Sequence, residues 1–251
     1  MTTTSASASI SPNPKLVGTY NVKVKLNPAF GGTKLSGQIT LASDGTWTGN
    51  VLSHFGCSEK GSRLATTTVL SLSDLDPGNP CDPKKIGMTW MITIGTNGSL
   101  GSAAAPGYLN VPYNFNATWD ATPAPHVPPV PHSSSSISPS AKLVGTYHAT
   151  LIDTITFGTT SITLNNDGTW TSTSASILIC GTTGTWLSSG KTVALSMYYT
   201  GNTGNPPCTA EVYGGTWMAS VKSGPSLGTA TKLGYINCPY FGNANWYATH
   251  S

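Results

Sequence analysis

The chain has 251 residues, of which 38% are hydrophobic and 8% charged, and its formal net charge is +3 at pH 7. This length and hydrophobic content are sufficient for two domains of ordinary size, each with its own core. The charge content is low, because charged residues make up about 25% of typical soluble domains. No basic cluster is interleaved with aromatic residues, so we expect no nucleic-acid partner. No apolar run approaches the roughly 20 residues of a membrane-spanning helix, and no signal-peptide pattern is present; we therefore expect no membrane insertion.

A repeat organises the chain. Residues 1–14 form a Ser/Thr/Pro-rich arm without hydrophobic periodicity. The sequence KLVGTY follows at residues 15–20 and recurs at residues 142–147, and the segment SISP at residues 9–12 recurs at residues 136–139. We infer two copies of one domain, at residues 15–122 and 141–251, separated by a Pro/Ser-rich linker at residues 123–140. We expect Ile10 and its counterpart Ile137 to pack against the domains.

The first copy opens with an alternating segment at residues 20–26. Val22, Val24 and Leu26 fall on one face, and Lys23 and Lys25 fall on the other. Strict alternation of apolar and polar residues is typical of a strand with one buried face. The sequence therefore predicts a half-buried β-strand here.

An Asp-Gly dipeptide at residues 44–45 separates two alternating apolar segments, which is a strong signal for a β-hairpin. Trp47 follows this turn, and in the second copy Trp170 follows the same dipeptide at residues 167–168. Aspartate in such turns accepts local backbone hydrogen bonds. We therefore predict a turn role for Asp44 and Asp167 rather than acid–base chemistry.

Turn signals divide each copy into about eight short strands, with no helical periodicity. The predicted fold is all-β, with two tandem, homologous, antiparallel β-barrels or sandwiches. Closure into barrels would remove exposed strand edges. Proline is dense between Pro123 and Pro131, and such a segment favours an extended, semi-rigid spacer. We therefore expect the linker to hold the domains apart, so that side-by-side packing would have to be added by an assembly.

Four of the five cysteines occupy matching places in the two copies. We predict one disulfide in each domain, Cys57 with Cys81 and Cys180 with Cys208, with buried free thiols as the alternative. Disulfides would suit an oxidising, extracellular setting. Cys238 has no cysteine counterpart, and we expect it to be a small apolar core residue.

Candidates for catalysis and metal binding are sparse. The five histidines lack metal-ligand spacing and lie at His54, His126, His132, His148 and His250. The loop from Asp74 to Asp82 gathers oxygen ligands, so a calcium ion is an alternative there to a solvated loop. An enzyme would be expected to bring ionisable groups together in a pocket. We predict no catalytic residue, no metal site and no cofactor, and we expect a protein that is not an enzyme.

Six of the seven tryptophans are equivalent in pairs between the copies, namely Trp47/Trp170, Trp90/Trp217 and Trp119/Trp246. The seventh, Trp186, is at the position in the second copy that Arg63 occupies in the first. Large aromatic side chains usually pack in cores, and we expect this first. The alternative is a platform on which a carbohydrate or small ligand stacks, which requires an exposed ring beside hydrogen-bonding side chains.

The order of a Gly-Thr-Tyr first strand, an Asp-Gly-Thr-Trp hairpin, a later Gly-Thr-Trp at residues 215–217 and a terminal Asn-Trp-Tyr at residues 245–247 resembles the avidin and lipocalin (calycin) type of small up-and-down β-barrel. The resemblance implies a small apolar ligand in the barrel mouth. The chain departs from this type in its regularly placed cysteines, and it lacks a recognisable set of polar ligand-binding residues.

The sequence favours a non-enzymatic structural or interaction protein displayed on a particle or cell surface, such as a virion decoration or fibre component. Its expected partners are proteins in an assembly, with other copies of the chain among the candidates. The alternative is a secreted tandem β-barrel protein that binds a carbohydrate or a small apolar ligand. Either function implies an extracellular or virion-surface location.

Overall fold

The computed structural model describes residues 10–55, 59–74, 87–95, 97–111, 116–124, 136–152, 157–173, 183–197, 215–222, 224, 226–237 and 243–251. In these ranges the regular secondary structure consists of β-strands and short 3-10 helices. None of the described helices has the length and apolar character needed to cross a membrane. The predicted all-β class is confirmed.

Residues of the first copy form a closed barrel, called barrel 1. Each strand pairs antiparallel with the next, and the last strand returns to the first. The strands are β1 (Gly18–Leu26), β2 (Lys34–Leu41), β3 (Thr46–Gly49), β4 (Glu59–Ala65), β5 (Val69–Asp74), β6 (Met88–Thr93), β7 (Gly107–Asn110) and β8 (Ala117–Pro123), with 3-10 helices η1 (Pro14–Leu16), η2 (Pro28–Phe30) and η3 (Ser53–Phe55). In β1 the predicted alternation is confirmed, because Val22, Val24 and Leu26 are buried while Lys23 and Lys25 are exposed.

The second copy repeats this order as barrel 2, in which β10 pairs with β17 and β12 pairs with β13. Its strands are β10 (Gly145–Ile152), β11 (Phe157–Leu164), β12 (Thr169–Ser172), β13 (Thr183–Ser189), β14 (Thr192–Met197), β15 (Gly215–Ser220), β16 (Gly234–Asn237) and β17 (Ala244–His250), preceded by η4 (Ala141–Leu143). A short strand, β9 (Ile137–Ser138), adds to β13, and in barrel 1 Ser11 forms the matching bridge with Ala65. The domains are therefore barrels rather than sandwiches.

The two Asp-Gly turns have the predicted local role. Asp44 Oδ1 accepts hydrogen bonds from the Thr46 backbone N–H at 2.9 Å and from the Thr46 hydroxyl at 2.6 Å. Asp167 Oδ1 accepts the same two bonds from Thr169, at 2.9 and 2.6 Å. The hydroxyl bond from Thr46, followed by the backbone bond, lowers the pKa of Asp44. Each carboxylate therefore stabilises the turn that precedes the strand with the equivalent tryptophan, Trp47 in β3 or Trp170 in β12.

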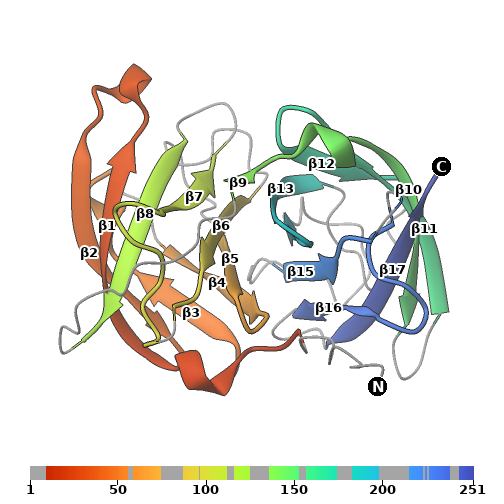
Figure 1. Ribbon diagram of the computed structural model, residues 1–251, viewed down its shortest axis with the longest axis horizontal. Helices are drawn as coiled ribbons and strands as arrows, with labels where there is room; N and C mark the ends of the chain where they lie inside the picture. Colours follow the sequence, from red (N-terminus) through yellow and green to blue (C-terminus); the bar gives the residue numbers. More distant parts are fainter. Residues whose placement is uncertain are drawn as a thin grey trace, which may run out of the picture.

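The barrels lie side by side, with β4, β5 and β6 of barrel 1 against β13, β14 and β15 of barrel 2 (Figure 1). A hydrophobic cluster between them contains fully or almost fully buried side chains from both barrels, at Leu64, Val69, Met91, Leu187, Ala194 and Met218. Ile10 and Ile137 pack against this cluster, as expected for the repeated arm. The expectation that the linker holds the barrels apart is therefore wrong: the outer faces of these strands are apolar or small, and burying them against each other removes that surface from water.

Two asparagines join the barrels reciprocally. Asn237 of barrel 2 donates from Nδ2 to the carbonyls of Gly45 and Arg63, each at 2.9 Å. Asn110 of barrel 1 donates from Nδ2 to the carbonyl of Gly168 at 3.0 Å and to the carbonyl of Trp186, the counterpart of Arg63, at 3.2 Å. Gly45 and Gly168 have φ of 86° and 81°, and a Cβ at either would collide with the opposing amide. The turn glycines therefore serve both the turn and the interface.

Hydroxyl groups form a second set of contacts between the barrels. Thr216 Oγ1 lies 2.7 Å from Ser62 Oγ and 2.9 Å from the Ser62 carbonyl. At the matching place, Thr89 Oγ1 lies 2.6 Å from Thr185 Oγ1 and 2.9 Å from the Thr185 carbonyl. Each contact is repeated with the barrels exchanged, as in the self-complementary interface of a two-fold dimer. One chain thus contains a pseudo-two-fold pair of barrels.

The ends of the predicted linker take part in the fold. Pro123 is the last residue of β8 and pairs with Tyr20, while Ile137 belongs to β9. Residues 125–135 lie outside the described part of the chain. The domain boundaries themselves stay a prediction.

Candidate functional site

Three of the paired tryptophans form a connected set inside each barrel. In barrel 1 the ring of Trp90 packs edge to face against Trp47 and Trp119, with centroids 5.8 and 5.3 Å away. In barrel 2 Trp217 occupies the middle position, 5.7 Å from Trp170 and 5.2 Å from Trp246. Rings at such distances and inclinations attract one another beyond the burial of their area. These residues form the centre of each core.

The indole N–H groups are hydrogen-bonded more completely in barrel 1. Trp47 and Trp170 donate equivalently to the carbonyls of Ser73 and Ser196, at 2.7 and 2.6 Å. Trp90 donates to Asp74 Oδ2 at 3.4 Å, and Trp119 donates to the Tyr108 carbonyl at 3.3 Å. Their counterparts in barrel 2, Trp217 and Trp246, have no partner for Nε1 among the described residues. The strand register puts Met197 in the place of Asp74, which accounts for the difference at Trp217.

All seven tryptophans are at most 1% exposed. The predicted core-packing role agrees with this burial. The stacking platform requires an exposed ring, and within the described part of the chain the six paired rings do not provide one. A ligand role for Trp47, Trp90, Trp119, Trp170, Trp217 or Trp246 stays a prediction that would need the rings to become accessible.

Other residues singled out by the sequence fall where the structure is not described. Cys57, Cys81, Cys180, Cys208 and Cys238 all lie outside the described residues, as do residues 75–82 of the alternative calcium loop. The two disulfides and the role of Cys238 therefore stay predictions. Among the described residues, no group of three or more histidine, cysteine or acidic side chains is arranged to hold a metal ion.

Arg63 and Trp186 occupy the same place in the two barrels with different chemistry. Arg63 is fully buried, and its Nη2 donates to the Ala42 carbonyl at 2.7 Å while Nη1 donates to the Asn13 carbonyl at 3.3 Å. Trp186 Nε1 donates to the Asn165 carbonyl, the counterpart of Ala42, at 3.0 Å. Burial lowers the pKa of Arg63, against the opposing effects of Tyr20 and Asp44. Each side chain therefore donates a hydrogen bond to the equivalent carbonyl of its own barrel.

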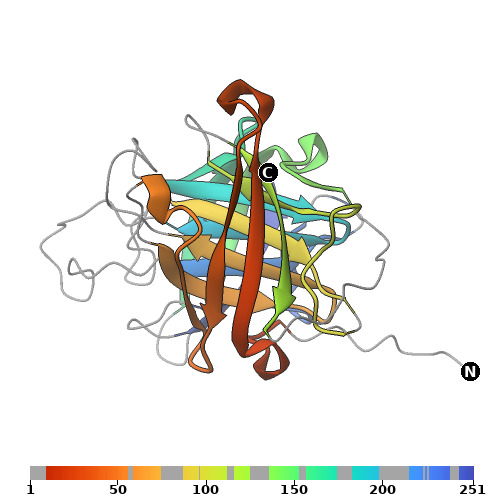
Figure 2. The ribbon, with the colours of Figure 1, turned by 90° about the vertical axis from the view of Figure 1, so that its left-hand side faces the viewer.

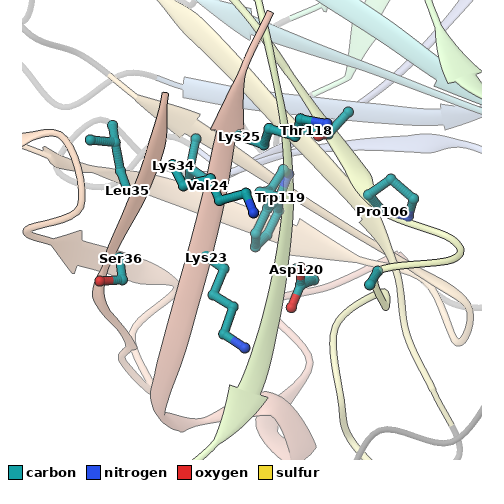
Figure 3. Close-up of a pocket in the computed structure, with 11 residues that line it drawn as sticks. Lys23, Val24, Lys25, Lys34, Leu35, Ser36, Pro106, Thr118, Trp119 and Asp120 are labelled. Carbon is teal, nitrogen blue, oxygen red and sulfur yellow. The ribbon is translucent and has the colours of Figure 1, made fainter. Parts of the chain in front are cut away.

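A hollow among the described residues lies on barrel 1, at strands β1, β2 and β8 and the segment that leads into β7 (Figure 3). We call it the outer groove. Its volume is about 660 Å³. Charged and polar side chains from the outward positions of the strands line it together with residues of the wall and the segment before β7: Lys23, Val24, Lys25, Lys34, Leu35, Ser36, Ala103, Pro106, Thr118, Trp119 and Asp120.

Charge in the outer groove is predominantly positive. Three of its lining side chains are lysines, and Asp120 is the one acid among them. Asp120 pairs with Lys23 across β1 and β8, and Figure 3 shows the two side chains on the same side of these strands. Burial raises the pKa of Asp120, while the nearby Lys23 ammonium acts in the opposite direction.

A smaller hollow of about 290 Å³ adjoins the outer groove and shares Lys25 and Thr118 with it. Sequence reasoning placed Lys23 and Lys25 on the exposed face of a strand but assigned them no function. A usable signal was present, because the charged residues at these positions have neutral counterparts in the second copy. The groove itself was not predictable, since Pro106 and Lys34 join it from distant parts of the chain.

Comparisons with known proteins add little. Neither the family models nor the curated proteins compared with this chain give a match. One solved structure, described as a "putative outer membrane protein" from Bacteroides fragilis NCTC 9343, is 13% identical, with 94% of this chain and 98% of that chain covered and a TM-score of 0.30. A likeness of this strength carries no argument about the fold or function of this chain.

Proposed function

We propose that this chain is a non-enzymatic binding protein that holds a small organic ligand in the outer groove of barrel 1. The observation that carries the proposal is the groove itself. Its volume of about 660 Å³ lies within the range of about 300 to 1,000 Å³ that is usual for ligand sites. Polar side chains converge on it from three neighbouring strands.

The position of the groove supports this role. It lies on β1, β2 and β8, whereas the contacts between the barrels involve β4, β5 and β6. Figure 2 looks onto the outer side of barrel 1 and shows β1 and β2 in front of the strands that contact barrel 2. The inter-barrel interface can therefore stabilise the scaffold without covering the site.

The proposal extends to the type of barrel. The next-neighbour order of eight strands, closed by β1 and β8, is the order of up-and-down barrels such as lipocalins and streptavidin. We propose that the barrels are of this calycin type. In that type the ligand is expected in the barrel mouth, whereas the described interior of barrel 1 is filled around Trp90; the outer wall is the better candidate for the site.

The test uses N-phenyl-1-naphthylamine, a neutral apolar fluorophore, titrated into the intact chain. One saturable site per chain is expected, because barrel 2 has neutral residues at the register positions of the charged side chains that line the groove. Ser36→Trp would fill the groove and should abolish binding, whereas Thr159→Trp, at the equivalent register position of barrel 2, should leave binding unchanged. Absence of saturable binding, or two sites insensitive to Ser36→Trp, would refute the proposal.

A second candidate function is a structural component displayed on a particle or cell surface. The observation in its favour is the pseudo-two-fold interface, which makes a pre-assembled two-barrel unit from one chain. Sedimentation of the purified chain would test it: assembly into discrete particles or fibres supports display, and a persistent monomer argues against self-assembly. The extracellular or virion-surface location remains a prediction under either function.

A further inference from the structure

Two lysines in the outer groove face each other without an intervening acid. The register of β1 and β2 places Lys25 directly opposite Lys34, and both side chains are exposed. Like charges directly opposite each other on neighbouring strands destabilise a sheet. On the other side of β1, the register partner of Lys25 is the neutral Thr118. The one acid of the groove, Asp120, is instead the register partner of Lys23.

A protective role does not explain both members of this lysine pair. Lysines on strands commonly block edge-to-edge pairing of exposed sheet edges. Lys25 has a register partner on each side, Lys34 in β2 and Thr118 in β8. Lys34 lies in the part of β2 that pairs with β1 alone, since the register of β2 with β3 covers only Ile39–Leu41. Edge protection therefore does not explain Lys25, which lies between two paired strands.

Barrel 2 lacks these charges at the same register positions. Thr150 stands in the place of Lys23, and Ile152 in the place of Lys25. Tyr247, which pairs with Thr150, replaces Asp120. The fold therefore forms without the charged groups, and their presence in barrel 1 calls for a different explanation.

We infer that the outer groove binds the anionic head group of a small organic molecule between Lys25 and Lys34. An anion placed there would compensate two ammonium groups at once by charge-assisted hydrogen bonds, which are shorter and stronger than neutral ones. The aliphatic stems of the lysines, together with Pro106, offer apolar surface to the body of the ligand. This inference rests on the proposed function, because it assigns a ligand class to the same groove.

The experiment compares two probes with a closely related ring system. 1-Anilinonaphthalene-8-sulfonate carries a sulfonate, whereas N-phenyl-1-naphthylamine is neutral. Fluorescence titration of the intact chain should give about tenfold or tighter binding of the sulfonate, equivalent to one strong additional contact. Lys25→Gln/Lys34→Gln should abolish that difference while retaining the neutral probe. Lys232→Gln, which removes one exposed charge from barrel 2, should change neither affinity.

Two further readouts separate a defined site from general charge attraction. Decanoate and decyl phosphate should each displace the sulfonate probe at lower concentration than decanol does. The double lysine variant should unfold at the same temperature as the wild type or higher, since it relieves the repulsion between the two ammonium groups.

The outcomes are distinguishable. Equal affinity of the two probes, persistence of the preference for the sulfonate in the double variant, or displacement by decanol as effective as by decanoate would overturn the anion inference while leaving the binding function standing. If neither probe binds, the proposed function fails with it. If the double variant does not fold, Lys25→Ile, which copies the residue of barrel 2, provides the same test.

Discussion

The two barrels share a scaffold but differ at the positions that carry charge. Both have eight strands in the same order and a central set of three tryptophans. Barrel 1 contains the buried Arg63, the buried Asp74 beside Trp90 and the charged outer groove. The central tryptophans, the interface methionines and the reciprocal asparagines match between the barrels. The charged residues Arg63 and Asp74 have the neutral counterparts Trp186 and Met197. The shared architecture therefore does not depend on the charges of barrel 1.

The largest expected effect tests whether equivalent residues of the two barrels contribute equally to the stability of the inter-barrel interface. Met91 and Met218 are both fully buried in the inter-barrel cluster. Each replacement by alanine should lower the free energy of unfolding by about 2 to 5 kcal/mol, and the two losses should be similar. Chemical denaturation would measure them, with Val17→Ala at a 44% exposed position as a control expected within about 0.5 kcal/mol of wild type. A loss confined to one methionine would contradict the pseudo-symmetry.

The next effect concerns two equivalent buried tyrosines. Tyr147 donates to the Leu143 carbonyl at 2.8 Å, and burial raises its pKa to about 12 from 10.0. Below pH 10 this residue is protonated in both the folded and unfolded states, so its contribution to the free energy of unfolding is fully present. Between pH 10 and 12 the unfolded state ionises first and binds fewer protons, so the free energy of unfolding falls, by about 3 kcal/mol in total.

Tyr147→Phe should remove this part of the fall in the free energy of unfolding at alkaline pH, as measured by urea denaturation at pH 9 to 12. Burial also raises the pKa of the counterpart Tyr20, but the Arg63 charge lowers it. Tyr20→Phe should therefore have a smaller effect on the alkaline loss than Tyr147→Phe. An identical alkaline profile for wild type and Tyr147→Phe would show that the hydroxyl is not protected in the folded state.

The reciprocal asparagines predict a third, smaller effect. Asn110→Ala or Asn237→Ala would leave two carbonyls of the opposite barrel without their amide donor. A lost buried hydrogen-bond partner costs about 1 to 3 kcal/mol, and the two variants should be equally affected. Thermal denaturation would measure this, with the exposed Asn21→Ala as the matched control. Unequal losses would indicate that one turn depends more on the interface than the other.

The smallest expected effect comes from making barrel 1 resemble barrel 2. Arg63→Trp places the residue of barrel 2 beside the matched carbonyl and removes a buried charge. Replacing buried charge by well-packed apolar volume is often neutral or stabilising, so we expect a change within about 1 kcal/mol at pH 7. The pKa of Tyr20 should rise, which spectrophotometric titration of tyrosine would detect. A large loss of stability would show that Arg63 has a role that Trp186 does not share.

Much of each barrel was predictable because its determinants are local. The alternation at Val22 and Val24 identified a half-buried strand, and the Asp-Gly turns identified the hairpins that precede Trp47 and Trp170. The candidate site was predicted less well. The paired tryptophans were expected first as core residues, and they are buried; the alternative of a ligand platform stays a prediction. The outer groove was not predicted, because periodicity reports which face of a strand is exposed but not which exposed residues from distant segments meet.

By itself, the sequence determined the duplication, the all-β class and the turns, since strand alternation and turn chemistry act over a few residues. Only the tertiary structure decided that the barrels contact each other, because that depends on the outer faces of β4 to β6 meeting their counterparts. Asn237 reaches the Gly45 carbonyl across 192 residues of sequence, and Lys34 meets Lys25 only through the register of two strands. Contacts of this kind depend on how completed elements pack, and no local pattern in the chain encodes them.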